Sequence, residues 1–258
     1  MELLFSGVLS LGSVAYFHRL ATQLESESDS RAALQAYGPP DIVFTTLLVL
    51  WFLTNIIGSA NRVVELNSEV LIVGALFSLL LIAIVLSFLT FRSQNPMDLF
   101  GLRGVSVGQT LKAGCFGLIA ALPAVYFIHS LCLLLMHADA TPQPLLQFLK
   151  ENATAQDRAL LILTALIVAP LAEELIFRGY VFGVLRRYTG RWWAMAISAL
   201  VFAAIHAHLP SFAGLFALAI ALTLVYEVAG SLWAAILMHS LFNAITVLFT
   251  LVWPDVLN

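Results

Sequence analysis

The chain has 258 residues, of which 61% are hydrophobic and only 10% are charged. Soluble domains carry about 45–50% apolar and about 25% charged residues. The composition therefore excludes a soluble globular enzyme, a disordered protein, a secreted disulfide scaffold and a nucleic-acid-binding protein. The formal net charge of −3 is too small to indicate an acidic or a basic partner. The class that remains is an all-α, polytopic membrane helix bundle.

Eight apolar segments follow one another along the chain. They lie near residues 3–17, 42–60, 70–91, 111–136, 159–185, 192–209, 211–227 and 231–253. A membrane-spanning helix needs roughly 20 residues, so the first segment is marginal in length. We expect it to be an uncleaved span, because no basic residue precedes it as in a signal peptide. Pro210 separates the sixth segment from the seventh, since proline cannot continue a helix without cost. The sequence thus predicts about eight transmembrane helices.

Three of the connections are long enough to interpret. Residues 18–41 are polar and residues 137–157 contain two prolines, so both are predicted to be loops. Residues 95–103 are predicted to form a short interfacial stretch. No internal repeat is visible, and one membrane domain is the simplest interpretation.

Basic residues divide unequally between the two faces of the predicted bundle. With eight spans, and with Arg178 left aside, the poorer face holds Arg62, Lys150 and Arg158. Because cytoplasmic loops carry an excess of Lys and Arg, we expect the richer face to be cytoplasmic and both termini to be extracytoplasmic. The richer face holds Arg19, Arg31, Arg92, Arg103, Lys112, Arg186, Arg187 and Arg191. This predicts a multi-pass protein of a bacterial inner membrane.

Polar side chains that are expensive to bury in a membrane are gathered in the last third of the chain. A charged group at the bilayer centre costs at least about 2.5–3.5 kcal/mol, and such groups are usually functional. They are Glu173, Glu174 and Arg178 in the fifth segment, His206 after Phe202 in the sixth, and His239 with Asn243 in the eighth. Glu174 and Arg178 are four residues apart and are expected to pair on one helix face.

Residue counting brings four of these side chains to similar depths. At 1.5 Å per residue from the nearest cytoplasmic turn, Glu173 and His206 lie at about 22 Å. His239 lies at about 14 Å and Asn243 at about 20 Å. A carboxylate beside a histidine can take a proton from water. Two donors one helical turn apart suit the oxyanion that forms when water attacks an amide. The pattern predicts hydrolysis by water inside the membrane, without a zinc-protease, serine-hydrolase or nucleotide-binding motif.

At these residues the sequence resembles the CPBP family of intramembrane proteases. The residues that carry the resemblance are Glu173-Glu174-x-x-x-Arg178, Phe202-x-x-x-His206 and His239-x-x-x-Asn243. The family includes the type II CAAX prenyl endopeptidases and the bacterial abortive infection membrane proteins. The resemblance divides the chain into membrane helices of unknown role at 1–158, a catalytic helical core at 159–250 and a C-terminal end at 251–258.

The resemblance implies a role for each matching residue. Glu173 would be the general base, His206 would help to position the water, and His239 with Asn243 would form the oxyanion site. Glu174, Arg178 and Phe202 would support that site. The implied enzyme is a metal-independent endopeptidase that cleaves a peptide bond near the cytoplasmic face. Its partners would be the lipid bilayer and a protein or peptide substrate, with or without a lipid modification.

Three alternatives stay open on the sequence alone. The first is a zinc-dependent version of the same protease, with Glu173, His206 and His239 as ligands and an open fourth position. The second is a proton-coupled transporter, since Glu, His and Arg also build proton relays. The third is a non-catalytic membrane scaffold or immunity protein, in which Glu173 could be changed without loss of function.

Overall fold

A computed structural model describes residues 2–26, 36–59, 66–137, 143–151 and 153–252, and every regular element within these ranges is a helix. This confirms the all-α membrane bundle. In chain order the elements are α1 (Glu2–Ser26), α3 (Pro39–Ser59), α4 (Ser68–Phe91), α5 (Pro96–Leu99), α6 (Val107–Met136), α7 (Pro144–Glu151), α8 (Ala155–Leu163), η1 (Thr164–Val168), α9 (Ala169–Glu174), η2 (Leu175–Val181), α10 (Phe182–Thr189), α11 (Arg191–Ile205), α12 (Leu209–Ala229) and α13 (Leu232–Val252).

Six helical stretches in the described residues are long and apolar enough to cross a membrane. They are Pro39–Gly58, Ser68–Phe91, Val107–Met136, Ala155–Thr189, Leu209–Ala229 and Leu232–Val252. The expected count of eight is therefore not confirmed. The sixth predicted segment forms α11, which has 15 residues and is too short to span the hydrocarbon core alone. The first segment lies within α1, which is not among the six.

Two predicted loops contain helix. The segment 18–41 was expected to be a loop, but α1 continues to Ser26 and α3 begins at Pro39. The segment 137–157 was also expected to be a loop, yet it contains α7 and the start of α8. The prolines at α3 and α7 stand at the first helical position, where the missing N–H removes no hydrogen bond. The short interfacial stretch is present as α5.

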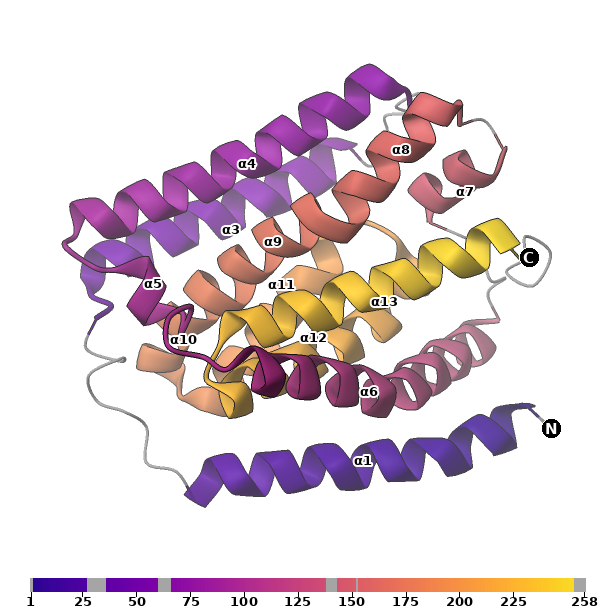
Figure 1. Ribbon diagram of the computed structural model, residues 1–258, viewed down its shortest axis with the longest axis horizontal. Helices are drawn as coiled ribbons and strands as arrows, with labels where there is room; N and C mark the ends of the chain where they lie inside the picture. Colours follow the sequence, from indigo (N-terminus) through magenta and orange to yellow (C-terminus); the bar gives the residue numbers. More distant parts are fainter. Residues whose placement is uncertain (1, 27–35, 60–65, 138–142, 152, 253–258) are drawn as a thin grey trace.

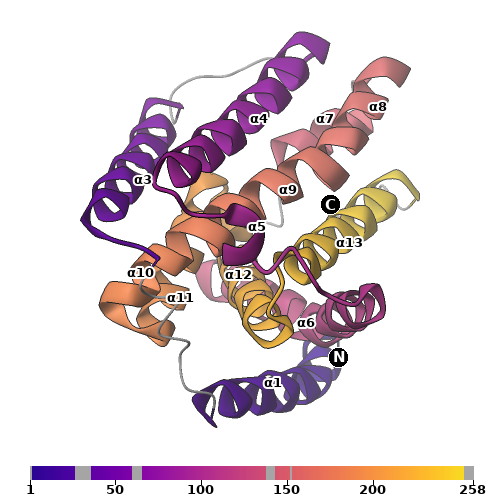
Figure 2. The same ribbon diagram turned by 60° about the vertical axis from the view of Figure 1, so that its left-hand side comes forward.

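The long helices run side by side, so that their ends form two opposite ends of the bundle (Figures 1 and 2). We call these the α5 end and the α7 end. At the α5 end, Arg186 and Arg191 both pair with Glu227, which joins α10 and α11 to the end of α12. At the α7 end, the Ser68 hydroxyl donates a hydrogen bond to Asp157 Oδ1, and this bond joins the starts of α4 and α8. α1 lies outside, against α6 and α12.

The α5 connection rests on the start of α13. The Leu232 N–H donates to the Phe100 carbonyl at 3.0 Å. Gly101 has a φ of +61°, and a Cβ on it would overlap the carbonyl of Gly230. Only glycine fits both the left-handed backbone and this close approach. The contact fixes where α13 begins, and therefore the depth of the polar residues further along it.

An ion pair between a buried aspartate and a half-buried arginine joins α3, α4 and η2 near the α5 end. Asp41 is fully buried and pairs with Arg92. The same carboxylate accepts hydrogen bonds from the Gly38 N–H at 2.6 Å and the Tyr180 hydroxyl at 3.2 Å. Neither Asp41 nor Arg92 was singled out from the sequence as a pair. The network holds the front helices against the helix that carries the two glutamates.

We expect Asp41→Ala to lower the free energy of unfolding by about 1–3 kcal/mol, because it leaves the buried Gly38 N–H without its acceptor and the half-buried Arg92 without its carboxylate. Thermal denaturation of the detergent-purified protein measures the loss. Asp98→Ala is the matched control, since its pair with Arg103 spans 3.7 Å between side chains that are more than half exposed. Such exposed pairs contribute about 0–1 kcal/mol. Equal melting temperatures for both variants would contradict the prediction.

Candidate active site

Glu173 and Glu174 lie near the centre of one long helical stretch. The stretch Ala155–Thr189 runs through α8, η1, α9, η2 and α10 as a single candidate span. The π-helical turns η1 and η2 lie on either side of α9, which ends in the two glutamates. π-Turns widen a helix locally, release backbone groups and often occur at functional sites. The adjacent glutamates point about 100° apart around the helix, so they contact different neighbours.

Glu174 accepts from two partners and is fully buried. Its Oε1 accepts from Arg178 Nη1 at 2.8 Å, as the i,i+4 spacing predicted. The same oxygen lies 2.7 Å from His239 Nδ1 on α13. Because a carboxylate only accepts, Nδ1 of His239 carries its proton towards Glu174. The Glu174 carboxylate therefore fixes the orientation of the His239 ring.

Arg178 is 1% exposed and is enclosed by three neighbours. Besides the pair with Glu174, its guanidinium lies 4.2 Å from the centre of the Phe202 ring. Its Nη2 donates to the Ala219 carbonyl at 3.4 Å. A cation over an aromatic face is attracted by the ring quadrupole, most strongly when both are out of water. Phe202 thus supports the ion pair from α11.

Glu173 faces a different environment from Glu174. Its side chain is 25% exposed, and its Oε2 lies 3.9 Å from His239 Nε2. Within the described structure, this oxygen is buried and has no hydrogen-bond partner. His239 is 4% exposed and stands between the two carboxylates. Glu174 therefore holds the His239 imidazole in place, while Glu173 keeps one carboxylate oxygen without a partner beside the same ring.

His206 and Asn243 are each anchored by a backbone carbonyl. His206 Nδ1 lies 2.8 Å from the Phe202 carbonyl, so this nitrogen carries a proton and the other ring nitrogen points away. Asn243 Nδ2 donates to the Ala165 carbonyl in η1 at 2.8 Å. One of the two amide hydrogens of Asn243 is thus occupied, which the sequence pattern did not predict.

A cavity of about 220 Å³ brings four of the candidate residues together from three helices. Glu173, His206, His239 and Asn243 all line it. Glu174, Arg178 and Phe202 do not line it, and they lie behind the lining residues. The candidates therefore fall into two sets. The four lining residues can contact a substrate, and the three buried residues hold the lining residues in place. The proximity of the four lining residues is a property of the structure.

The zinc alternative needs three ligands at bonding distance. Across the described ranges, no group of three His, Cys, Asp or Glu side chains is arranged to hold a metal ion. Each imidazole uses Nδ1 in a protein hydrogen bond, which leaves Nε2 as the nitrogen that could coordinate a metal. Glu173, His206 and His239 share a cavity, and zinc dependence is tested by the metal-removal experiment described under the proposed function.

Comparison with known proteins matches the part of the chain that builds this cavity. The family model for type II CAAX prenyl endopeptidases, Rce1-like, matches residues 155–245. The Bacillus subtilis (strain 168) protein named "Putative membrane peptidase YdiL" is 32% identical over 92 residues. The chain belongs to the CPBP family. The resemblance seen in the sequence is thereby confirmed.

A second relative extends the similarity beyond this region. An uncharacterized 24.3 kDa protein of Escherichia coli is 33% identical over 149 residues, which cover 55% of this chain and 67% of the relative. The match to the Bacillus protein covers 36% of this chain and 38% of that protein's length. No solved structure matches the chain.

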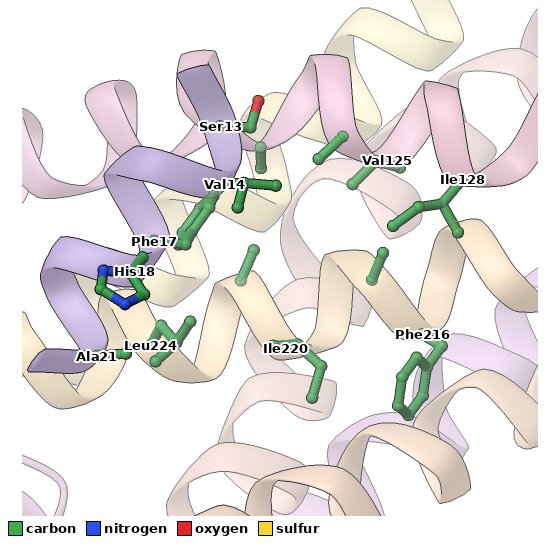
Figure 3. A pocket seen from close by; sticks show the side chains of 14 residues that line it. Ser13, Val14, Phe17, His18, Ala21, Val125, Ile128, Phe216, Ile220 and Leu224 are labelled. Carbon is green, nitrogen blue, oxygen red and sulfur yellow. The ribbon is translucent and has the colours of Figure 1, made fainter. Parts of the chain in front are cut away.

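A second, larger cavity lies away from these residues. It has a volume of about 440 Å³ and lies between α1, α6 and α12. Figure 3 shows its lining, which is apolar apart from Ser13 and His18. It shares no lining residue with the cavity at Glu173. Without an acid beside its histidine, it lacks the groups for water activation.

Sequence reasoning missed part of the cavity wall. Gln143, Leu145 and Leu146, at the start of α7, line it together with Thr164 and Thr246. The apolar residues of Pro144–Glu151 recur at helical spacing, which could have revealed an amphipathic helix in the expected loop. The two threonines carry no motif. Only the packing of η1 against α13 brings them to the site.

Proposed function

We propose that this protein is an intramembrane endopeptidase in which Glu173 activates water. The observation that carries the proposal is the single cavity lined by Glu173, His206, His239 and Asn243. The family of the matched region points to a membrane protease. The division into one reachable glutamate and one buried glutamate supports a general base with a separate supporting pair.

The reaction needs a base and a polarised water. A water molecule in the cavity can donate a hydrogen bond to Glu173 Oε2. Nε2 of His206 is the acceptor of the neutral ring, so it can hold the second hydrogen of that water. As the water oxygen attacks the peptide carbonyl carbon, Glu173 takes the first proton. When the C–N bond breaks, the same carboxylic acid returns the proton to the leaving amine.

The negative charge that develops on the carbonyl oxygen needs hydrogen-bond donors. Nε2 of His239 faces the cavity, and it is a donor when the ring is protonated on both nitrogens. Asn243 has a second amide hydrogen besides the one given to Ala165. Preorganised donors of this kind are typically worth about 10²–10³ in rate each. Glu174 and Arg178 hold the histidine in place during the reaction.

The substrate class is a protein or peptide segment that reaches the cavity from the bilayer or its surface. The walls are mostly apolar, with leucines from α4, α7, α8 and α12. An apolar cavity of this kind can accept a lipid-modified or an unmodified segment. The protein would act as a multi-pass enzyme of a bacterial inner membrane.

A comparison of protein termini tests the proposal. Membranes are prepared from cells that carry wild type or Glu173→Ala at matched protein level, and new N-termini are identified by mass spectrometry. We expect termini that depend on wild type, and these name the substrate. A wild-type phenotype that Glu173→Ala retains, without any change in termini, would contradict proteolysis and favour the scaffold alternative. Flux that depends on a pH gradient would favour the transporter.

Metal removal is expected to leave activity unchanged. No three side chains in the described structure are arranged as a metal site, and water activation by Glu173 needs no metal. Cleavage at the wild-type-dependent sites is measured after dialysis against a chelator, with zinc added back in a parallel sample. Elemental analysis of the purified protein gives the zinc content. Stoichiometric zinc, with activity lost to the chelator and restored by zinc, would overturn the metal-independent mechanism.

A further inference from the structure

The positive charge of the described chain lies almost entirely at the α5 end. Among the described residues, seven basic residues lie in the connections at that end or within about two helical turns of it, and only Lys150 and Arg158 lie at the α7 end. The seven are Arg19, Arg92, Arg103, Lys112, Arg186, Arg187 and Arg191. Arg178 is buried within the bundle and is not counted. An excess of Lys and Arg in short loops marks the cytoplasmic face.

The helix that leads to His206 is short. α11 starts at the α5 end and has 15 residues, a length of about 22 Å, whereas the hydrocarbon core is about 30 Å thick. His206 follows its last residue as the C-cap, and the chain turns at Ala207, whose φ is +48°. The next helix begins at Leu209. The turn joins α11 to α12, and both helices run from it towards the α5 end.

The cavity lies beside this turn, where His206 lines it. Glu173 and His239 lie near the middle of their helices, and the remaining lining residues lie level with them or towards the α7 end. Leu71 belongs to the first turn of α4, and Val247 to the last part of α13. The short helix α7 contributes Gln143 and two leucines at the outer edge. No residue of α5, α10 or the α12–α13 connection lines the cavity.

From these two asymmetries we propose that the catalytic cavity opens to the extracytoplasmic face. Its substrates are then segments of membrane or exported proteins that are presented at that face, beside α7. This proposal rests on the proposed function. It replaces the expectation that cleavage occurs near the cytoplasmic face. The physical reason is the position of the lining residues, which lie level with Glu173 and His239 or towards the α7 end, away from the basic residues.

Cysteine accessibility tests the orientation without any assay of cleavage. Cys115 and Cys132 are first changed to alanine. Gln156→Cys then places one thiol at an exposed position of the α7 end, and Thr189→Cys places one at an exposed position of the α5 end. A membrane-impermeant maleimide is added to spheroplasts or to inside-out vesicles. We expect labelling of Gln156→Cys only in spheroplasts and of Thr189→Cys only in inside-out vesicles. The reverse pattern would overturn the proposal.

A third thiol reports on the opening of the cavity itself. Thr246 lines the cavity but is not part of the proposed catalytic set. Thr246→Cys is treated with a small, charged methanethiosulfonate in the same two preparations. We expect reaction in spheroplasts, as for Gln156→Cys. Reaction only in inside-out vesicles, or no reaction in either preparation, would overturn an extracytoplasmic opening.

The orientation and the proposed function fail in different ways. If the protein were not a protease, every labelling result would stay unchanged. A cytoplasmic opening would leave the effect of Glu173→Ala on protein termini unchanged, and would require the cleavage sites to lie in cytoplasmic segments. The termini that depend on wild type thus also test the proposal, because we expect them in extracytoplasmic segments.

Discussion

Glu173→Gln is expected to reduce the rate of substrate cleavage by about 10²–10⁴-fold, the usual contribution of a general base. Glutamine keeps the size of the side chain and can still bind a water molecule, but its amide cannot take a proton. The fold should be nearly unaffected. Glu173 is one quarter exposed, and its contact with His239 spans 3.9 Å. The loss is therefore expected in kcat rather than in stability.

The measurement is the initial rate at which the wild-type-dependent termini appear after induction of each variant. Protein level and melting temperature in detergent are recorded in parallel. Glu69→Gln is the matched control, because Glu69 is exposed in the first turn of α4, two residues from the cavity residue Leu71. We expect it to cleave at the wild-type rate. A Glu173→Gln protein that cleaves as fast as Glu69→Gln would remove Glu173 from the mechanism.

The helical content of the chain and the pairing within a helix could be predicted from the sequence. The rise of 1.5 Å per residue is a property of the backbone, so counting residues gave similar depths for Glu173, His206 and Asn243. The structure brings these residues to one cavity. The spacing of Glu174 and Arg178 likewise gave their ion pair. Both inferences depend on one helix at a time, where the geometry is fixed.

Contacts between helices could not be predicted in the same way. The hydrogen bond from His239 to Glu174 depends on the rotation and tilt of α13 against α9, which no local pattern specifies. The donation from Asn243 to the Ala165 carbonyl depends in addition on the π-turn η1, which changes the direction of the carbonyl groups. Residue spacing shows which side chains share a helix face, but not which side chain they meet.

Short elements were the other source of error. α7 was expected to be part of a loop because Pro144 was taken as a break, whereas it starts the helix. α11 was expected to be a full span, because the apolar pattern continues past its end at Ile205. Both errors concern the α7 end of the bundle.

Arg178→Met is expected to lower the free energy of unfolding by about 3–5 kcal/mol, the usual cost of leaving one charge of a buried pair uncompensated. Glu174 would remain fully buried, with His239 as its remaining partner. Activity should fall with the folded fraction. This single variant cannot separate a structural role of the pair from the orientation of His239. A second substitution is needed for that.

The double variant Glu174→Leu with Arg178→Met separates the two roles. It removes both charges and fills the space with apolar groups, which is often neutral or stabilising for a buried pair. We therefore expect its melting temperature to return towards that of wild type, a coupling typical of residues in contact. Its kcat should stay low, since His239 Nδ1 has lost its acceptor and the ring is free to turn away from Glu173. Recovery of both stability and kcat would show that Glu174 acts only in folding. Recovery of stability alone would show that the buried carboxylate positions the histidine for the reaction.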